Sequence, residues 1–419
     1  MDIADVDLLD PDRFRRQEHH EMFEVLRRED PVHWTEETDG PGFWSITKLA
    51  DLQIINRDAE GFSSEAKGVN IPEIDNEENN AFDMRGQMML MTDPPKHTRY
   101  RLLVNKGFTP RMIGLIEEHL RYRAELIVDS VIERGSCDFV LDVAAELPLQ
   151  AIAEIMGVPH DDRHMLFDWT NKMIGADDPE YAQDVESSME AQMAAAELYM
   201  YAANLRVDRA EKPLDDIVTK LINAEIGGDR LSDAEFEMFI LLLAVAGNET
   251  TRNATSHGMH ALITNPDQYA KLVANPDLID SAVEEIVRWA TPVMYFRRQA
   301  MRDLDLRGTQ IKAGDKVVMW HISANRDEDA FVDPFRFDIE RSPNDHVGFG
   351  GGGAHFCLGA NLARAELRLI FRELVTRIPD MALAADVERL RSNFIGGIKH
   401  MPVTFTPGER KHPVGVSAA

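Results

Sequence analysis

The chain is poor in cysteine and in basic residues, and it has no long apolar run. Only two cysteines, Cys137 and Cys357, occur in 419 residues, which excludes a disulfide framework and a four-cysteine zinc site. Lysine and arginine number 45 against 73 aspartates and glutamates, so the formal net charge is −28. Nucleic acids and anionic membranes are bound through basic surfaces. The charge balance therefore argues against both kinds of partner.

Targeting signals are also scarce. The longest uninterrupted apolar run, residues 238–246, has nine residues, whereas a membrane-spanning helix needs about 20. The start, MDIADVDLLD, lacks the basic and apolar regions of a secretory signal. We therefore expect a cytoplasmic protein without a membrane span. Its 44% hydrophobic and 28% charged residues are typical of a globular chain, expected as a single domain over residues 1–419 with flexible ends at 1–10 and 408–419.

Helical periodicity dominates, and Pro and Asn-Pro sites divide the chain into segments. Short strands are predicted at residues 32–34 and 43–46, and in a second group at 304–306, 310–311 and 317–320. The acidic, aperiodic stretch 70–89 predicts a mobile loop. The expected fold class is therefore mainly α with small β-sheets.

Two helices have clear signals. Ser232 and Glu235 form a capping box before a mostly apolar run, and the next helix breaker is Asn265-Pro266. This pattern predicts a helix of about 32 residues, roughly 48 Å long, that runs through the core. A second helix is predicted at residues 361–378, where Pro379 ends it.

Cys357 follows a glycine-rich loop, Phe349-Gly-Gly-Gly-Gly-Ala-His-Phe-Cys357, and directly precedes the second helix. Glycines let a backbone approach a flat or bulky group closely, and the amide N–H groups of a helix N-terminus stabilise a thiolate. These features suit an axial haem ligand. The alternative is a buried cysteine that acts only as a small hydrophobe.

The same loop also matches a nucleotide-binding pattern. Gly348, Gly350 and Gly353 fit the spacing G-x-G-x-x-G of dinucleotide-binding proteins. That fingerprint requires a preceding strand and a surrounding βαβ unit. The preceding residues, RSPNDHV, are turn-like, so a nicotinamide dehydrogenase is the weaker interpretation.

Polar residues interrupt the middle of the long helix, at Ala246-Gly247-Asn-Glu249-Thr250-Thr. A glycine there costs about 1 kcal/mol relative to alanine, and a threonine hydroxyl can bond the carbonyl one turn back. A small gap beside the Glu249–Thr250 pair suits dioxygen binding and proton delivery. The alternative is an ordinary polar helix end.

A third motif, Glu285-x-x-Arg288, is by itself typical of a solvated helix face. In this order, however, the three motifs resemble the cytochrome P450 superfamily of haem-thiolate monooxygenases, from about Asp10 to Thr406. The resemblance implies the P450 fold and insertion of one oxygen atom of O2 into an unactivated C–H bond. Cys357 is then the proximal thiolate ligand of haem b iron and favours O–O cleavage.

The resemblance also implies roles for further residues. Glu249 and Thr250 would deliver protons with ordered water. The cofactor-binding residues that it implies are His97, Arg101, Arg298, His355, Phe349, Gly351, Ala246 and Gly247. The implied structural triad beneath the haem is Glu285, Arg288 and Arg336.

One departure from the usual family loop is informative, because Phe349 lies one residue further from Cys357 than is common. This form resembles a narrower bacterial group that hydroxylates terminal methyl groups of sterol side chains and methyl-branched lipids. The residues expected around such an apolar substrate are Leu242, Leu243, Val245, Val293, Met294 and Ile395. Methionines, which adapt to irregular apolar shapes, are expected to add to the pocket: Met84, Met88, Met89, Met91, Met173, Met189 and Met193.

Electrons must come from other proteins, since no flavin or nicotinamide domain is visible. The expected partners are a ferredoxin and its reductase. A basic patch near Cys357 is predicted to guide their docking, formed by Arg364, Arg368, Arg372, Lys96, Arg99 and Lys106.

Three alternatives remain within or near this class. Hydroxylation of a terpene or an alkane would use the same chemistry on another substrate. A haem-thiolate peroxygenase would need no ferredoxin, although such enzymes usually lack the acid–alcohol pair. A haem sensor without catalytic activity would show no turnover with any reductant.

Overall fold

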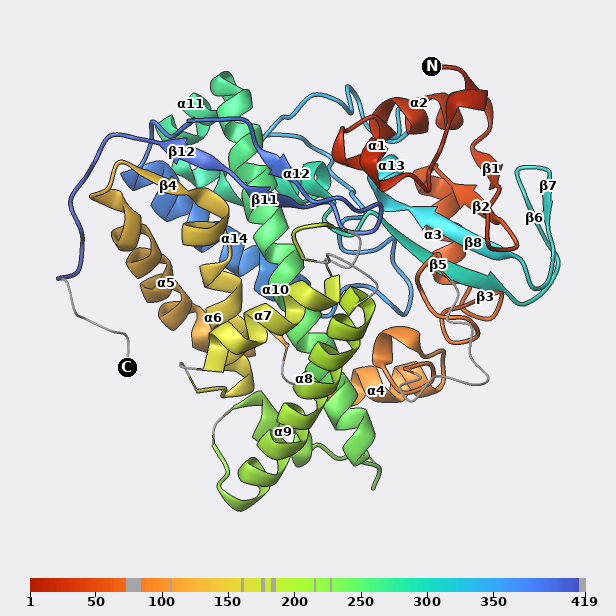
Figure 1. Cartoon of the computed structure of the whole chain (residues 1–419), viewed down its shortest axis with the longest axis horizontal. Helices are drawn as coiled ribbons and strands as arrows, with labels where there is room; N and C mark the ends of the chain where they lie inside the picture. The colour runs from red at the N-terminus through yellow and green to blue at the C-terminus, as the bar shows by residue number, and fades with distance from the viewer. Residues whose placement is uncertain are drawn as a thin grey trace.

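A computed structural model of the chain describes residues 1–72, 84–105, 108–159, 162–174, 178–181, 186–214, 216–226 and 228–413. Most of this structure is helical, and the larger sheet lies to one side of the helices (Figure 1). No helix among these residues is both long and apolar enough to cross a bilayer. The α-helices are α1 (Pro11–Arg15), α2 (His19–Glu29), α3 (Leu49–Arg57), α4 (Lys96–Val104), α5 (Pro110–Ile132), α6 (Glu146–Met156), α7 (Arg163–Ile174), α8 (Glu186–Glu211), α9 (Ile217–Ile222), α10 (Asp233–Thr264), α11 (Pro266–Ala274), α12 (Ile279–Ala290), α13 (His321–Ala324) and α14 (Ala360–Arg377).

The strands are short, and single helical turns lie between several elements. The strands are β1 (Val32–Thr35), β2 (Phe43–Ile46), β3 (Phe62–Ser63), β4 (Ser136–Asp138), β5 (Tyr295–Ala300), β6 (Leu304–Leu306), β7 (Thr309–Ile311), β8 (Lys316–Trp320), β9 (Ala382–Leu383), β10 (Glu388–Arg389), β11 (Ile398–His400) and β12 (Pro402–Thr404). The short turns are η1 (Ile3–Asp5), η2 (Met89–Met91), η4 (Val140–Ala144) and η6 (Pro276–Leu278). The mainly α class with small sheets is therefore confirmed.

Helix α10 runs through the middle of the molecule (Figure 1) and has 32 residues, as the sequence predicts. The hydroxyl of Ser232 accepts a hydrogen bond from the N–H of Glu235 at 3.3 Å, and the Glu235 carboxylate accepts one from the N–H of Ser232 at 2.9 Å. The capping box thus satisfies two amide groups that the helix leaves free. Helices α6, α7, α8, α12 and α14 pack against α10, which makes it the central element of the core. Helix α14 is confirmed to within one residue at each end.

The larger sheet has the order β1-β2-β8-β5-β3. β2 and β8 are parallel, with Trp44 opposite Val317 and Ile46 opposite Met319. The sequence grouped β8 with β6 and β7, but those two strands form a separate hairpin. The reason is burial: all five residues of β8 are buried, and a strand with both faces covered takes a central place in a sheet.

The two ends, which we expect to be flexible, contact the rest of the molecule at a few residues. Leu8 is fully buried beside Phe14 and Met22. The N–H of Gly408 donates to the Ile132 carbonyl at 3.0 Å, and residues 411 and 412 donate to Asp129 of α5 at 2.9 and 2.8 Å. Each described end thus has at least one residue in contact with the rest of the molecule, and residues 414–419 lie outside the described residues.

The predicted mobile loop at 70–89 is described only at its ends. Residues 73–83 lie outside the described residues. Ile71, Met88 and Met89 are buried in hydrophobic clusters. These three residues of the stretch are therefore part of the core.

Candidate active site

An internal cavity lies between the middle of α10 and the loop before α14. The polar motif of α10 and the glycine loop with Cys357 both contribute residues to its wall. Predicted residues in its wall are Cys357, Phe349, His355, His97, Arg101, Arg298, Thr250, Ala246, Gly247, Leu242, Leu243 and Val293. Apolar wall residues that the sequence did not indicate include Leu90, Phe108, Ile152, Phe239, Phe296 and Val287.

The glycine loop before Cys357 is shaped by close contact with α3. Gly350 and Gly353 have φ angles of 96° and 76°, in the left-handed region that favours glycine. A Cβ atom on Gly353 would lie 1.9 Å from the carbonyl oxygen of Asn56. Gly351, which the resemblance predicts as a cofactor-binding residue, faces α3 and does not line the cavity. The glycines let the loop pass between α3 and the cavity.

The two cysteines have different surroundings. Burial raises the pKa of the Cys357 thiol, while the N–H groups of Gly359 and Ala360 and the guanidinium of Arg101 act in the opposite direction. Burial raises the pKa of the Cys137 thiol, in β4, to about 12. Only Cys357 of the two lines the cavity. A metal ion bound there would favour the thiolate form.

One end of the cavity is lined by four basic side chains, those of His97, Arg101, Arg298 and His355. The rings of His97 and His355 are 4.1 Å apart between centroids. Burial and the neighbouring positive charges lower the pKa of His97 to about 4 and that of His355 to about 2. Burial lowers the pKa of Arg298 to about 10, with Asp93 acting against it. The two guanidinium groups provide positive charge and the two neutral imidazoles can each donate one N–H, which together fit the carboxylates of a haem.

On the facing wall, Thr250 donates a hydrogen bond to the Ala246 carbonyl at 2.7 Å, the bond expected of a mid-helix threonine. Glu249 lies behind this wall, is 1% exposed, and forms an ion pair with Arg252. Burial raises the pKa of Glu249, and Arg252 opposes the shift. One Glu249 oxygen, Oε1, has no hydrogen-bond partner among the described residues.

Gly247 serves the packing of α6 against α10. A Cβ atom at Gly247 would lie 2.2 Å from Cδ1 of Ile152. Both residues also line the cavity. The glycine therefore brings α6 close enough for Ile152 to form part of the wall.

A buried ion-pair network lies on α12. Arg288 donates two hydrogen bonds to Glu285, each 2.7 Å long. The third charged group is Arg341, whose Nε lies 3.1 and 3.3 Å from the two Glu285 oxygens. Arg336 is exposed, and only its carbonyl reaches Arg288, at 3.3 Å. Among the described residues, the guanidinium of Arg336, predicted as the third member of the triad, makes no hydrogen bond to Glu285, and that of Arg341 does.

Comparison with known proteins identifies the family. The family model of cytochrome P450 matches residues 127–378, which is more than half of the chain. The chain belongs to the cytochrome P450 family. It is accordingly a P450 monooxygenase that uses a haem iron, and the buried basic end and Cys357 of the cavity fit such a group.

Two relatives and one solved structure are similar to this P450 over more than nine-tenths of its length. A steroid C26-monooxygenase of Mycolicibacterium smegmatis is 46% identical over 409 residues, with 96% of this chain and 94% of the relative covered. A methyl-branched lipid omega-hydroxylase of Mycobacterium tuberculosis is 44% identical over 394 residues, with 92% and 90% covered. A Mycobacterium marinum cytochrome P450 in complex with pseudoionone has a TM-score of 0.89 and 42% identity, with 96% and 98% covered. The predicted P450 fold and subgroup resemblance are thus confirmed.

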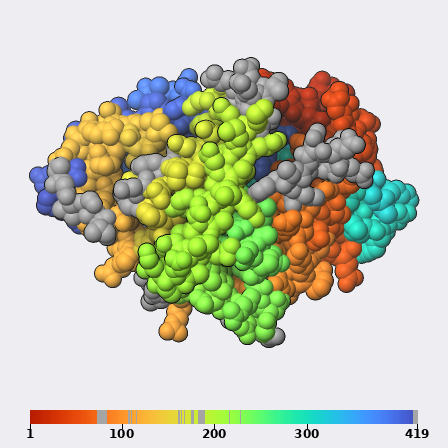
Figure 2. Space-filling view, turned by 60° about the horizontal axis from the view of Figure 1, so that its bottom comes forward, coloured from red at the N-terminus to blue at the C-terminus, as the bar shows by residue number. Residues whose placement is uncertain are grey.

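Several predicted pocket residues of the P450 lie elsewhere. Val245 and Ile395 do not line the cavity, although Ile395 forms an antiparallel backbone bridge with Val293, which does. Met294 belongs to the hydrophobic cluster that contains Trp320. Of the methionines, Met89 lines the cavity and the others do not. Met189 and Met193 are 59% and 57% exposed, on the outer surface of α8 that Figure 2 shows in yellow-green. The 3.6-residue period of α8 turns Met189 and Met193 away from α10.

The P450 cavity also contains an acid that the sequence analysis missed. Glu366 of α14 lines the cavity and is 1% exposed. Burial raises the pKa of Glu366 to about 8, so the side chain is largely neutral at neutral pH. Its position among Ala363, Leu367 and Ile370, on the apolar face of the predicted helix, is the signal that could have identified it.

The predicted basic docking patch is largely neutralised by carboxylates on α12 and η6. Arg364 pairs with Glu284 at 2.6 Å, and Arg368 lies 3.4 Å from Asp280. The other predicted cations also have partners or cannot be placed: Arg372 lies 3.9 Å from Asp277, Arg99 pairs with Asp229 and Glu235, Lys96 bonds the Gly86 carbonyl, and Lys106 lies outside the described residues.

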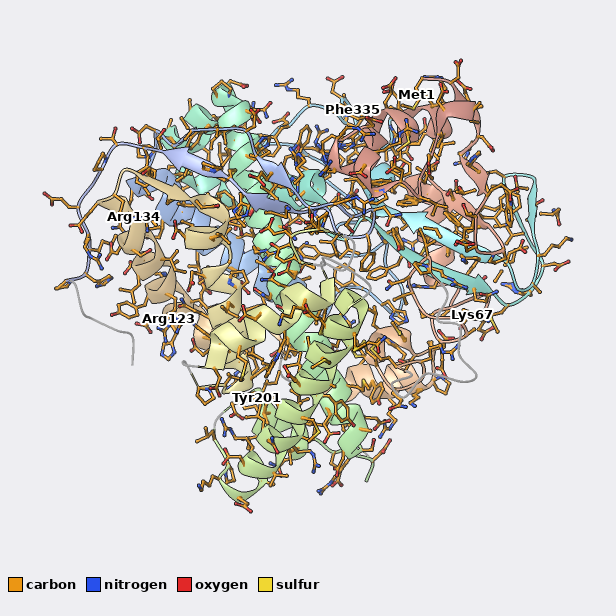
Figure 3. The ribbon with its side chains drawn as sticks, viewed as in Figure 1. Met1, Lys67, Arg123, Arg134, Tyr201 and Phe335 are labelled. Carbon is orange, nitrogen blue, oxygen red and sulfur yellow. The ribbon has the colours of Figure 1, made fainter. Side chains whose placement is uncertain are left out.

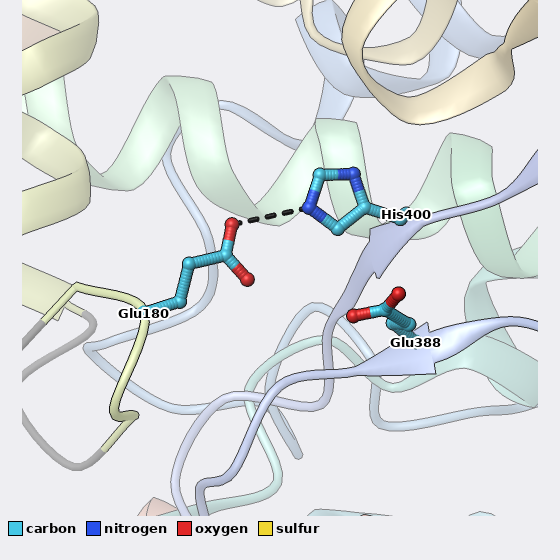
Figure 4. A group of neighbouring side chains, drawn as sticks. All are labelled: Glu180, Glu388 and His400. Carbon is cyan, nitrogen blue, oxygen red and sulfur yellow. Dashed lines mark hydrogen bonds and ion pairs between the residues drawn. The ribbon is translucent and has the colours of Figure 1, made fainter.

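One group of side chains has the composition of a metal site (Figure 4). Glu180, Glu388 and His400 place ligand atoms within 4.8 Å of one another. Glu180, however, pairs with Lys399 at 2.6 Å and with His400 at 3.1 Å. The Glu180 carboxylate therefore already has cationic partners in the protein. We interpret the three side chains as a contact between residues 178–181 and β11, not as a metal site.

Proposed function

We propose that this P450 hydroxylates the terminal carbon of a sterol side chain or methyl-branched lipid, with haem b as its cofactor. The observation that carries the proposal is the cavity, where Cys357 and Thr250 lie on opposite walls among apolar side chains. The 46% and 44% identical relatives that are a steroid C26-monooxygenase and a methyl-branched lipid omega-hydroxylase support the substrate class.

Cys357 would ligate the haem iron through its thiolate. His97, Arg101, Arg298 and His355 would bind the haem carboxylates, since they form the buried basic end of the cavity. Haem b supplies the activation of O2. The protein supplies the ligand, the positive charge and the exclusion of water.

Proton delivery is assigned to Thr250 and Glu249. Thr250 lines the cavity, whereas Glu249 lies behind it and can take up a proton at Oε1. Because burial raises the pKa of Glu249, its carboxyl group can exchange protons closer to neutral pH than an exposed glutamate can. Arg252 holds the second oxygen and orients the group.

The substrate would be held by apolar contacts on the α10 side of the cavity. Leu242, Leu243, Phe239 and Phe108 lie there. Terminal methyl C–H bonds are stronger than secondary or tertiary ones, so attack at the chain end requires walls that present only that end to the iron. A terpene is the second candidate, because the M. marinum relative is in complex with pseudoionone.

Electrons would come from a ferredoxin and its reductase, and the enzyme would work in the cytoplasm where these proteins are reduced. The face around Cys357 is the shortest route to the iron. Phe356 is 40% exposed on this face, and the arginines of α14 are paired with carboxylates. We therefore expect docking through apolar contact as well as charge.

The ligand assignment is tested by spectroscopy on haem-loaded protein. The carbon monoxide complex of the reduced enzyme should have the strongly red-shifted Soret band of a thiolate-bound haem. Cys357→His should lose that band, while Cys137→Ala, the matched control, should keep it. Retention of the band in Cys357→His would refute the assignment.

The substrate class is tested by spin-state titration and product analysis. A sterol with an intact side chain, a methyl-branched fatty acid and pseudoionone should be compared under the same conditions with a ferredoxin system. We expect a spin shift and a terminal alcohol with one of the first two. A shift and product with pseudoionone alone would replace the lipid assignment by the terpene one.

A further inference from the structure

Helix α7 makes two side-chain contacts with the polar motif of α10. The amide oxygen of Asn171 accepts a hydrogen bond from Nη1 of Arg252 at 2.9 Å. One residue earlier, the hydroxyl of Thr170 accepts one from Nδ2 of Asn248 at 3.2 Å. Neither α7 side chain lines the cavity. Helix α7 therefore contacts α10 at residues on both sides of Glu249, the acid assigned to proton delivery.

Helix α7 is held on its other side by α8. Nε1 of Trp169 donates a hydrogen bond to the Glu197 carboxylate at 2.6 Å. The Trp169 ring lies 5.8 Å, between centroids, from the ring of Tyr201, which Figure 3 labels on α8. The Tyr201 hydroxyl donates to the carboxylate of Asp162, the residue before α7, at 2.8 Å. The contacts that α7 makes with α10 thus come from a helix that is itself fixed in place.

The guanidinium of Arg252 joins Asn171 to Glu249. Its Nη1 donates to Asn171 and its Nη2 to Oε2 of Glu249. Oε1 of Glu249 has no hydrogen-bond partner among the described residues. Because a guanidinium is rigid and planar, the positions of two of its partners fix its orientation. The place of the Asn171 oxygen therefore helps to set which side of the guanidinium faces Glu249.

The Glu285–Arg288 pair on α12 shows that the same i, i+3 spacing permits a contact with both oxygens. Nε and Nη2 of Arg288 donate to the two oxygens of Glu285, each at 2.7 Å. Nη1 of Arg288 donates to the carbonyls of Asn325 and Pro334. In both arginines Nη1 is thus bonded to another segment of the chain. What differs is where that segment lies, and this decides whether the arginine reaches one carboxylate oxygen or two.

The titratable groups near Glu249 are Arg252 and Tyr181. Burial raises the pKa of Glu249, and Arg252 opposes this shift. Burial also raises the pKa of Tyr181, on which Arg252 and Glu249 act in opposite directions, so the phenol is neutral at neutral pH. A contact of Arg252 with both oxygens would favour the carboxylate and lower the pKa of Glu249. The contact with one oxygen leaves the proton affinity of Glu249 higher.

We propose that Asn171 is a positioning residue for proton delivery. By holding Nη1, it turns the guanidinium so that Arg252 bonds one oxygen of Glu249 and leaves Oε1 available to protons. The proposal rests on the proton role proposed above for Glu249. It also makes that role depend on the docking of α7 against α10, because a displaced α7 would release Arg252 to bind both oxygens.

Infrared titration of the haem-loaded enzyme tests the contact without turnover. The carbonyl band of protonated Glu249 is assigned by its loss in Glu249→Gln. In Asn171→Ala we expect the midpoint of this band to fall by about one pH unit, a tenfold loss of proton affinity. Asn171→Asp, which keeps an oxygen acceptor for Nη1, should keep the midpoint at or above that of the wild type, and Lys172→Ala, at the next and exposed position, should leave it unchanged. An unmoved midpoint in Asn171→Ala, or no band that Glu249→Gln removes, would overturn the proposal.

Product formed per reductant consumed separates this inference from the proton role of Glu249. At neutral pH we expect the ratio to fall in Asn171→Ala and to be retained in Asn171→Asp and Lys172→Ala, with substrate affinity unchanged in spin-state titration. An unchanged ratio in Glu249→Gln would refute the proton role of Glu249, whatever the Asn171 variants do. A reduced ratio in Glu249→Gln together with a wild-type ratio in Asn171→Ala would keep that role and overturn the inference alone.

Discussion

Two glutamate–arginine pairs in this protein have the same spacing and different surroundings. Glu285–Arg288 on α12 and Glu249–Arg252 on α10 are both i, i+3 pairs, with side-chain exposures of 0%/0% and 1%/6%. Both oxygens of Glu285 are bonded, to Arg288 and Arg341. Glu249 has one oxygen bonded and one without a partner among the described residues.

The difference is consistent with a supporting role for Glu285 and with the proton-delivery role proposed for Glu249. In the α12 pair, Arg288 also donates to the carbonyls of Asn325 and Pro334, at 2.7 and 2.9 Å. A buried pair whose polar groups are all hydrogen-bonded holds its neighbours in place. In the α10 pair, burial raises the pKa of Glu249, which brings its proton exchange into a useful range. Both pairs share the i, i+3 spacing, so the spacing alone does not distinguish the two roles.

The largest expected effect comes from breaking the α12 network. Glu285→Gln leaves Arg288 and Arg341 buried without their counter-ion, and loss of one partner of a buried pair costs about 3–5 kcal/mol. That is a large part of a typical unfolding free energy of about 5–15 kcal/mol. We expect little haem-loaded protein and a strongly lowered urea midpoint. Arg336→Gln, the control at the exposed arginine, should change stability by no more than about 0.5 kcal/mol, and equal midpoints for the two variants would contradict the comparison.

The second effect should fall on catalysis rather than on folding. Glu249→Gln keeps a hydrogen bond to Arg252 but cannot carry a proton, so we expect turnover to fall by about 100-fold. Because Arg252 also donates to Asn171 at 2.9 Å, we expect a stability loss smaller than the roughly 3–5 kcal/mol of Glu285→Gln. Product formed per reductant consumed and the urea midpoint are the measurements. Thr250→Ala should keep substrate binding and release electrons as peroxide. A large loss of stability with unchanged coupling in Glu249→Gln would assign it the supporting role instead.

The smallest effect concerns Glu284, the residue next to Glu285, which pairs with Arg364 at 2.6 Å nearer the surface. Burial would raise the pKa of Glu284, but Arg364 and His346 lower it to about 2, below its ordinary 4.5. The pair therefore stabilises the fold above pH 4.5, and this contribution is lost as the pH falls toward 2. Since both side chains are about 30% exposed, Arg364→Gln should cost about 1 kcal/mol at pH 7 and less at pH 3.

Urea unfolding at the two pH values measures this effect. Arg372→Gln is the control, because its partner Asp277 is 3.9 Å away and 90% exposed. We expect no pH-dependent change in that variant. An Arg364→Gln loss that is equal at pH 3 and pH 7 would show that the pair does not act through charge.

Elements with local signals could be predicted closely. The bounds of α10 follow from the capping box at Ser232 and the break at Asn265-Pro266, which act within a few residues. The resemblance to the family depends on three local motifs in order, the Ala246–Thr251 motif, Glu285-x-x-Arg288 and the glycine loop with Cys357, each of which consists of residues close in sequence. Contacts between distant segments could not be predicted in the same way.

The sequence by itself determined the element types, the haem-thiolate motif and the acid–alcohol pair, because these depend on periodicity, capping and neighbouring residues. Tertiary structure decided that Arg341, not Arg336, completes the Glu285 network, that Gly351 faces α3, and that the arginines of α14 meet carboxylates of α12. It also decided that β8 pairs with β2. These outcomes depend on burial and charge balance between segments far apart in the chain, and a local pattern contains no information about which distant group will lie opposite.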